Sequence, residues 1–580
     1  MQLGNFKSSS PAPVSLNRRL DQWLPALTGS LWSGVFFIIL TTLAAYWPVF
    51  SAGFIWDDDA YVTDNSLLTA ADGWWRIWFS AHHQSQYFPL VYSTLRLEHA
   101  LWGFNALGYH AVNVGLHIIN ALLIWHLLKR LTVPGAWVAA ALFALHPVQV
   151  ETVAWVTELK NTESTLLYLL AVLAWLNFCA GRSRWFYSLA LGLHALALFA
   201  KTTACTLPAV LLLVLWLRDE PITWRRWWQV SPFVAMGLAM GLLSIWWEKH
   251  LDNYLPKYHL PGGIDRLLIA THAIWFYAGK VLWPVNLTFS YPRWNINAAN
   301  PAQYLWLAAC LLVAAFLWFK RRPLGRGTVA AVIFFVAVLS PMLGFIPLYT
   351  FYFSFVADHY QYLACLGLLA GVAALAVQVP KKWPAQRGRF WVVSMVMLLL
   401  LGGLTHQQCR AYVTPELLWM DTMAKNPRSW LAHTNLGRLQ AARKEFAAAA
   451  TNYVAALEIN PAEEEIYYNY GNLLARTGHP EAAVTRYQSA IELNPNLPDF
   501  HANLGVVLLQ LNRVDEAIIQ DKQAVMLQPG IMHYHFNFAN ALVAAHQTGA
   551  ALAEFQKALQ LEPDSELVKR RLRALGVVVN

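Results

Sequence analysis

The sequence predicts an all-α protein in which a bundle of membrane-spanning helices precedes a soluble α-solenoid. Of its 580 residues, 57% are hydrophobic and 13% are charged, and the charged fraction is about half that of an ordinary soluble domain. Apolar runs of about 16 to 21 residues recur between clusters of Lys and Arg up to residue 410, where a strict repeat begins. This composition excludes disordered, collagenous and coiled-coil proteins.

The first predicted span covers residues 31–50 and follows Arg18 and Arg19. Its apolar core is long and no small-residue cleavage site follows it, so we expect a retained anchor rather than a signal peptide, with residues 1–30 in the cytoplasm. Further spans bring the expected number to about eleven, within a membrane domain of residues 31–410. They are predicted at residues 109–128, 135–152, 162–180, 185–200, 204–217, 228–247, 302–319, 327–347, 361–379 and 390–406.

The positive charges provide a test of this topology, because Lys and Arg collect in cytoplasmic loops. Eleven spans with an inside N-terminus place every cluster in the cytoplasm, whereas a further crossing by residues 267–283 would move the later clusters outside. We therefore expect 267–283 to lie in the interface or to re-enter. The outer face then carries the first loop, 51–109, and the C-terminal repeats. The clusters include Lys129-Arg130, Arg182 with Arg184, Arg225-Arg226, Lys320-Arg321-Arg322 and Lys381-Lys382.

A 34-residue repeat fills the C-terminal part. Its closing proline recurs at Pro427, Pro461, Pro495, Pro529 and Pro563, and 34 residues is the period of tetratricopeptide (TPR) helix pairs. We expect four units over 428–562, a linker over 411–427, and a capping helix and tail over 563–580. Such a solenoid offers an extended concave surface for a polypeptide.

The net charge of +9 does not indicate a nucleic-acid-binding protein. The basic residues fall in short clusters between apolar runs, which membrane topology explains better than a nucleic-acid-binding face does. The five cysteines include no CxxC pair, so neither a disulfide framework nor a zinc site is expected. P-loop, GxSxG and GxGxxG signatures are absent as well, which argues against nucleotide use and serine-hydrolase chemistry.

Three adjacent acids, Asp57, Asp58 and Asp59, follow the first span. Carboxylates at a membrane boundary repel one another and resist desolvation, so the run suggests a general base or a site for a divalent cation. The alternative is an ordinary solvated start of a loop. The aromatic segment 74–79 in the same loop predicts a helix on the bilayer surface, with binding of a lipid-linked substrate as the second interpretation.

Other ionisable residues lie at the predicted outer ends of spans, where they are candidates for donor-phosphate or substrate contacts. Structural roles would also explain charged residues at these positions: a side chain that snorkels to the interface, an Arg stacked on an aromatic ring, or a helix cap. The spacing of His146 and Glu151 is not the i, i+4 of a helical zinc site. The candidates are His146, Glu151, Lys160, Lys201, Arg293 and His359.

Several segments together resemble the transmembrane-and-TPR (TMTC-like) protein O-mannosyltransferases of the GT-C class. The resemblance rests on Phe54–Asn65, Tyr109–His117, the run from His146 to Trp155, and Asp358-His359-Tyr360, followed by the repeats. It implies a polyprenyl-phosphate monosaccharide as donor, Asp57 as the base that deprotonates an acceptor hydroxyl, and Asp58 as the residue that orients it. It also implies that Lys160, Lys201, Arg293 and His359 stabilise the leaving phosphate. Many relatives carry Arg where this chain has Phe88 and His359.

We therefore expect a membrane hexosyltransferase that glycosylates Ser or Thr of a polypeptide held by the TPR groove. The alternatives are a non-enzymatic membrane-anchored TPR scaffold and a transferase that acts on a cell-envelope glycan. A bacterial inner membrane with periplasmic repeats is expected, and an endoplasmic-reticulum membrane with lumenal repeats gives the same topology. The sequence identifies no definite cofactor, and it leaves binding of a divalent metal by Asp57, Asp58 and Asp59 as an alternative.

Overall fold

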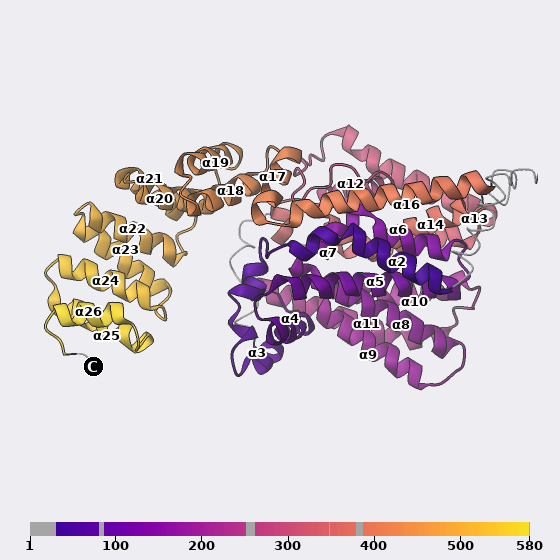
Figure 1. Cartoon of the computed structure of the whole chain (residues 1–580), viewed down its shortest axis with the longest axis horizontal. Coiled ribbons are helices and arrows are strands. Elements are labelled where there is room, and N and C mark those ends of the chain that lie inside the picture. Colours follow the sequence, from indigo (N-terminus) through magenta and orange to yellow (C-terminus); the bar gives the residue numbers. More distant parts are fainter. Residues whose placement is uncertain (1–30, 81–85, 251–260, 347–348, 379–386, 579–580) are drawn as a thin grey trace, which may run out of the picture. The chain divides into compact units, whose positions relative to one another are not determined.

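The computed structural model describes residues 31–80, 86–250, 261–346, 349–378 and 387–578 (Figure 1). The predicted cytoplasmic segment 1–30 and the pair Lys381-Lys382 lie outside these residues. The described residues form helices and turns without a strand, which confirms the all-α prediction. They divide into two compact units, Met1–Leu418 and Trp419–Asn580.

The membrane unit is built from long apolar helices. Among the described residues, five helices are long and apolar enough to cross a membrane, or six if the pair Ala136–Leu145 and Pro147–Ala154, bent by 56°, is one broken span. Shorter apolar helices accompany them, and the total of about eleven spans stays a prediction. The helices are α2 Leu31–Ala45, α3 Gly73–Phe79, α4 Pro89–Trp102, α5 Ala106–Arg130, α6 Ala136–Leu145, α7 Val150–Ala154, α8 Leu159–Cys179, α9 Trp185–Ala200, α10 Leu207–Leu217, α11 Trp224–His250, α12 Gly263–Leu282, α13 Tyr304–Leu339, α14 Cys365–Ala376, α16 Arg387–Cys409 and α17 Pro415–Lys425.

Two predicted spans share one helix. Residues 302–319 and the first part of 327–347 both fall within α13, which is interrupted at Gly325 by a non-helical backbone with φ of 74°. Pro323 lies just before this point, and proline removes a helical hydrogen bond while glycine tolerates the left-handed region. Pro323 and Gly325 therefore both favour an interruption of the helix at this point.

Helix α12 contains the stretch that was expected to lie in the interface or to re-enter. Near its start, Arg266 donates to the carbonyl of Phe345, and at its end the carbonyl of Val281 lies 2.9 Å from Nε2 of His146. Trp275 between them donates to the carbonyl of Trp306. All three partners belong to segments that the charge pattern assigns to the outer end of a span, and the placement of α12 in the interface or as a re-entrant segment stays a prediction.

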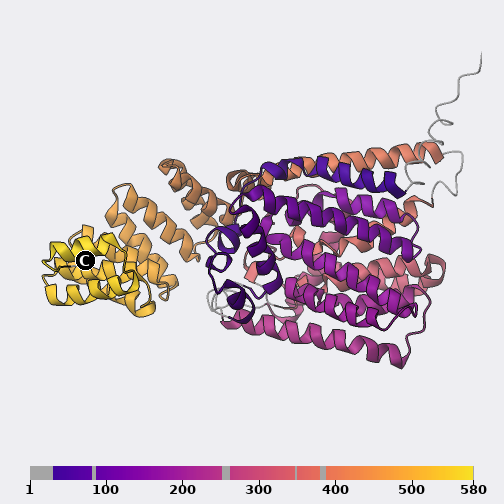
Figure 2. The ribbon, with the colours of Figure 1, turned by 60° about the horizontal axis from the view of Figure 1, so that its bottom comes forward.

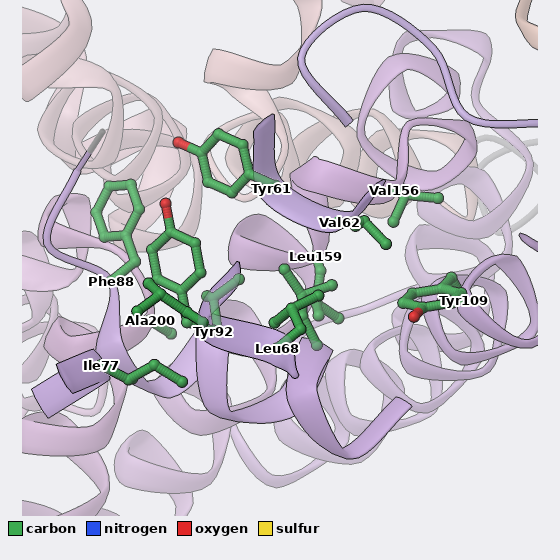
Figure 3. Packing of buried hydrophobic residues seen from close by; sticks show 13 residues of the cluster. Tyr61, Val62, Leu68, Ile77, Phe88, Tyr92, Tyr109, Val156, Leu159 and Ala200 are labelled. Carbon is green, nitrogen blue, oxygen red and sulfur yellow. The ribbon is translucent and has the colours of Figure 1, made fainter. Parts of the chain in front are cut away.

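The first outer loop folds onto the membrane helices. Its buried side chains, among them Tyr61, Leu68 and Tyr92, share one apolar cluster with Val156 and Leu159 at the start of α8 (Figure 3). The rings of Tyr61 and Tyr92 stack in parallel at 5.3 Å. This packing fixes the acidic run at the beginning of the loop against α8.

The outer side of the same loop is apolar. Trp75 and Phe79 of α3 are 62% and 73% exposed, and Leu97 and Leu101 of α4 are 54% and 70% exposed. Exposed aromatic and aliphatic side chains on short helices are typical of helices in the membrane interface, as the aromatic segment 74–79 suggested.

The second unit is a series of helix pairs with a final single helix (Figure 2). In three of the pairs a histidine ring bonds to the carbonyl of the preceding proline: His433 to Pro427, His501 to Pro495 and His535 to Pro529. The helices are α18 Trp430–Ala442, α19 Phe446–Ile459, α20 Glu464–Arg476, α21 Pro480–Leu493, α22 Pro498–Gln510, α23 Val514–Leu527, α24 Met532–Ala544, α25 Thr548–Leu561 and α26 Glu566–Ala574.

One core position of the repeat departs from its pattern. Tyr453, Tyr487 and Phe555 occupy it in three repeats, but the third repeat has Asp521, which is 1% exposed. Its Oδ1 has no hydrogen-bond partner among the described residues. Burial raises the pKa of Asp521 to about 8, so folding favours its protonated form.

We expect Asp521→Tyr to stabilise the chain by about 1–3 kcal/mol at pH 8, because it removes an unpaired buried carboxyl and restores the aromatic of the other repeats. The folded pKa of Asp521 lies above its unfolded value, so its contribution to stability is greatest below pH 4 and is lost as the pH rises through about 8. Thermal unfolding of the full chain at several pH values provides the measurement. A pH dependence that is the same in the wild type and the variant would contradict this account.

Candidate active site

Asp58 anchors the first outer loop to the start of α8. Its Oδ2 accepts from the amide of Ile55 at 2.8 Å, and its Oδ1 accepts from the amide and the hydroxyl of Thr157 at 2.9 and 2.5 Å. The side chain is fully buried. A carboxylate with three such donors is occupied in holding the loop and has little capacity left for a substrate.

The other two acids have different surroundings. Asp57 is partly buried, and its Oδ1 has no hydrogen-bond partner among the described residues. Asp59 is exposed and accepts from the hydroxyl of Thr63 at 3.2 Å. Burial raises the pKa of Asp57 to about 6 against the opposing effect of Lys160, and burial together with the charge of Asp57 raises the pKa of Asp58 to about 7. Of the three acids, Asp57 is the one suited to take up a proton.

The three acids do not form a metal site of the usual kind. In the part of the chain that the structure describes, no group of three or more His, Cys, Asp or Glu side chains could hold a metal ion. Asp58 is already saturated with donors and Asp59 points to solvent. Oxygen-ligated cations need several converging carboxylates or carbonyls, so the acidic run does not fit one.

A buried cluster of charges surrounds Glu158. Nζ of Lys160 lies 2.9 Å from Oε1 of Glu158, and Nζ of Lys201 lies 3.5 Å from its Oε2. Nε2 of His359 is 3.8 Å from Oε1. Electrostatic interactions also connect Asp57 to Lys160, Glu158 and His359. Because Lys201 and His359 come from segments distant from Glu158 and Lys160, the fold rather than a local motif completes this cluster.

A cavity of about 200 Å³ opens beside these cations. Lys160, Lys201 and His359 supply its charged wall together with Glu158, and polar, aromatic and aliphatic side chains supply the rest. Lys160 also lies 5.7 Å from the ring centre of Trp155, over its face, a cation–π geometry that favours the charged amine. The apolar lining includes Phe88, Trp155, Ile245, Trp247, Met342 and Ile346.

Five predicted site residues do not line this cavity: Asp57, Asp58, His146, Glu151 and Arg293. His146 is buried and bonds to the carbonyl of Val281 at 2.9 Å. Arg293 lies over the ring of Phe355, 5.2 Å from its centre. Glu151 contacts His359 from behind the cavity wall.

The sequence interpretation gave no site role to Glu158 or Thr157, although both contact predicted site residues. The available signal was the position of Glu158 two residues before Lys160 at the start of a membrane helix, where a buried charge needs a partner. Phe88 also lines the cavity.

Comparisons with known proteins agree with the predicted resemblance. The mouse (Mus musculus) protein O-mannosyl-transferase TMTC2 is 32% identical over 26% of this chain and 20% of its own length. The protein O-mannosyl-transferase F38B6.6 of Caenorhabditis elegans is 22% identical over 74% of this chain and 63% of its own. Residues 480–512 match the TPR repeat family. The chain is TMTC-like and carries TPR repeats.

The TMTC-like chain matches these relatives over part of their length. The Drosophila melanogaster protein O-mannosyl-transferase Tmtc1 is 28% identical over 47% of this chain and 35% of its own. Less than two thirds of each of these three relatives is therefore spanned. Among solved structures, a crystal structure of MamA is 21% identical over 26% of this chain and 87% of its own, with a TM-score of 0.25.

Proposed function

We propose that this chain is a GT-C-type membrane glycosyltransferase that moves a hexose from a polyprenyl-phosphate donor to a Ser or Thr hydroxyl of a polypeptide. Mannose is the first candidate for this hexose. The observation that carries the proposal is the placement of Asp57, whose Oδ1 has no hydrogen-bond partner among the described residues, where it interacts electrostatically with Lys160 and His359. A base next to a cation cluster matches what the transfer of a sugar from a phosphate to a hydroxyl requires.

Asp57 acts as the general base in this proposal. A hydroxyl is a weak nucleophile, so Asp57 accepts its proton while the hydroxyl oxygen bonds to the anomeric carbon of the sugar. The bond between that carbon and the phosphate oxygen breaks, and the electron pair leaves with the phosphate. A single displacement of this kind inverts the anomeric configuration. Asp58 keeps Asp57 in place through its hydrogen bonds to Thr157.

The cations stabilise the leaving group. The departing polyprenyl phosphate gains negative charge, which Lys160, Lys201 and His359 balance at the cavity wall. Glu158 holds the two lysines in position before the donor binds. The apolar lining near Ile245 and Trp247 suits the first isoprenoid units of the donor.

The TPR unit binds the acceptor polypeptide in this proposal. TPR solenoids present extended surfaces on which a polypeptide can lie, and the predicted topology puts the repeats on the same side of the membrane as Asp57. That side is the periplasm for a bacterial inner membrane and the lumen for the endoplasmic reticulum. The acceptor is then a secreted or membrane polypeptide with accessible Ser and Thr.

Transfer of radiolabelled sugar from polyprenyl-phosphate donors to endogenous acceptors tests the proposal. Membranes with the wild-type chain are compared with membranes that contain the Asp57→Asn, Asp58→Asn double variant at the same level. Label that enters protein only with the wild type supports the proposal. Label in glycan alone would point to a cell-envelope acceptor, and no label from several donor sugars would favour the scaffold.

A further inference from the structure

His359 is held by one carboxylate from two directions. Its ring Nδ1 lies 2.9 Å from Oε1 of Glu151, and its backbone amide donates to Oε2 of the same residue at 3.2 Å. The ring also packs edge-on against Trp155, with the ring centres 5.8 Å apart. Position and rotation of the imidazole are therefore both restrained, and Nε2 lies on the side of Glu158, 3.8 Å from its Oε1.

Glu151 does not reach the cavity that His359 lines. It is 2% exposed, while His359 is 8% exposed and forms part of the charged wall. Each carboxylate oxygen of Glu151 is directed at His359. Its hydrogen bonds therefore reach the cavity through the histidine, and it also interacts electrostatically with Lys201 of the cavity wall.

We infer that Glu151 is a positioning residue that aims Nε2 of His359 at the donor phosphate and balances the positive charge that the ring carries when it donates to that phosphate. The inference rests on the proposed function and names the part of the site that recognises the phosphate. A neutral imidazole that donates from Nδ1 has only an acceptor at Nε2, whereas an imidazolium donates from both nitrogens. A carboxylate at Nδ1 stabilises the imidazolium, as it does in catalytic triads.

The charged groups around His359 agree with this role. Glu151 faces Nδ1 from α7, and Glu158 lies 3.8 Å from Nε2. Lys160 shares Glu158 with the histidine, and Asp57 interacts with both. A phosphate that enters beside Nε2 meets Lys160, Lys201 and the ring of His359, with Glu158 already paired to both lysines, while Glu151 remains behind the ring.

The test compares kcat and KM for a polyprenyl-phosphate sugar in Glu151→Gln, His359→Gln, His359→Arg and the double variant Glu151→Gln, His359→Gln. We expect each single Gln variant to lose about 10- to 100-fold in kcat/KM. The double variant should lose no more than His359→Gln, because Glu151 acts through the histidine. His359→Arg should retain more activity than His359→Gln, since Arg carries its charge without a titrating proton.

Glu163→Gln is the matched control for folding. Glu163 is a carboxyl of the same unit, on α8; it accepts a hydrogen bond from Thr94 at 2.8 Å and does not line the cavity. Its variant should keep wild-type activity, and thermal unfolding should show that all variants are folded. The inference is wrong if the losses in kcat/KM of the two single variants multiply in the double variant. It is also wrong if Glu151→Gln keeps the wild-type kcat/KM, or if His359→Arg is no more active than His359→Gln.

Binding of undecaprenyl phosphate to the detergent-solubilised full chain separates this inference from the proposed reaction. We expect Glu151→Gln and His359→Gln each to weaken that binding about 10-fold or more. The double variant should bind no more weakly than His359→Gln alone. If the wild type transfers no sugar but binding follows this pattern, the reaction is wrong and the positioning role stands. If binding is the same in the wild type and Glu151→Gln, the positioning role is wrong.

Discussion

We expect Asp57→Asn to lower kcat for sugar transfer by about 10²- to 10⁴-fold, the range that loss of a general base produces. Asn keeps the shape of the side chain but cannot take up the proton of the acceptor hydroxyl. The KM for the donor should change little, because Asp57 interacts with the acceptor side of the reaction in the proposed mechanism. Initial rates with saturating donor measure the effect.

Asp59→Asn is the matched control, because Asp59 is the exposed neighbour and bonds only locally to Thr63. It should keep transfer close to the wild-type rate. Burial raises the pKa of Asp57 to about 6, so the base is protonated and inactive at lower pH. Transfer by the wild type should therefore increase as the pH rises through about 6. Equal losses in Asp57→Asn and Asp59→Asn would show that the acidic run acts as a whole and that Asp57 is not the base.

Lys160→Met should lower kcat/KM for the donor by about 10²- to 10³-fold, as expected when one charge-stabilising group is lost from a buried site. Met keeps much of the side-chain volume but removes the cation that lies 2.9 Å from Glu158 and lines the cavity. The loss should appear in both kcat and the KM for the donor, since in the proposed mechanism the amine contacts the phosphate before and during its departure. Steady-state kinetics with varied donor concentration provide the measurement.

Lys280→Met tests whether the effect is specific. Lys280 is a lysine of the same unit on α12, where it donates to the carbonyls of Val285 and Asn286 and does not line the cavity. Its variant should transfer sugar at close to the wild-type rate. Lys160→Arg should recover part of the activity because it restores the charge. A Lys160→Met variant that changes only the KM for the acceptor would contradict the assignment to the donor phosphate.

The sequence predicted the broad architecture because its signals are local and repeated. The low charge content and the apolar runs predicted the membrane unit, and the prolines spaced 34 residues apart predicted the TPR helix pairs. Each repeat carries its own apolar face, so its pattern can be read without knowing its neighbours. The number of spans is harder to read, because a kinked helix such as α13 and short helices such as α14 do not match the standard length of a span.

The candidate site shows where sequence patterns stop being informative. Asp57, Asp58 and Asp59 are chemically identical, yet Asp58 is held by Thr157 and Ile55, Asp57 interacts with Lys160 as well as Thr157, and Asp59 is exposed. His146 and His359 both lie at predicted outer ends of spans, but only His359 reaches the cavity. Nothing in the local pattern of either residue reveals this difference.

The sequence by itself determined the all-α class, the membrane character, the repeats and the set of ionisable residues at the outer boundary. Only the tertiary structure decided which of these residues meet, because the decisive contacts join distant segments. Asp58 bonds to Thr157 across 99 residues, and His359 bonds to Glu151 across 208. Periodicity encodes which face of a helix is apolar, but the pairing of buried charges depends on how helices pack, and no local pattern specifies that packing.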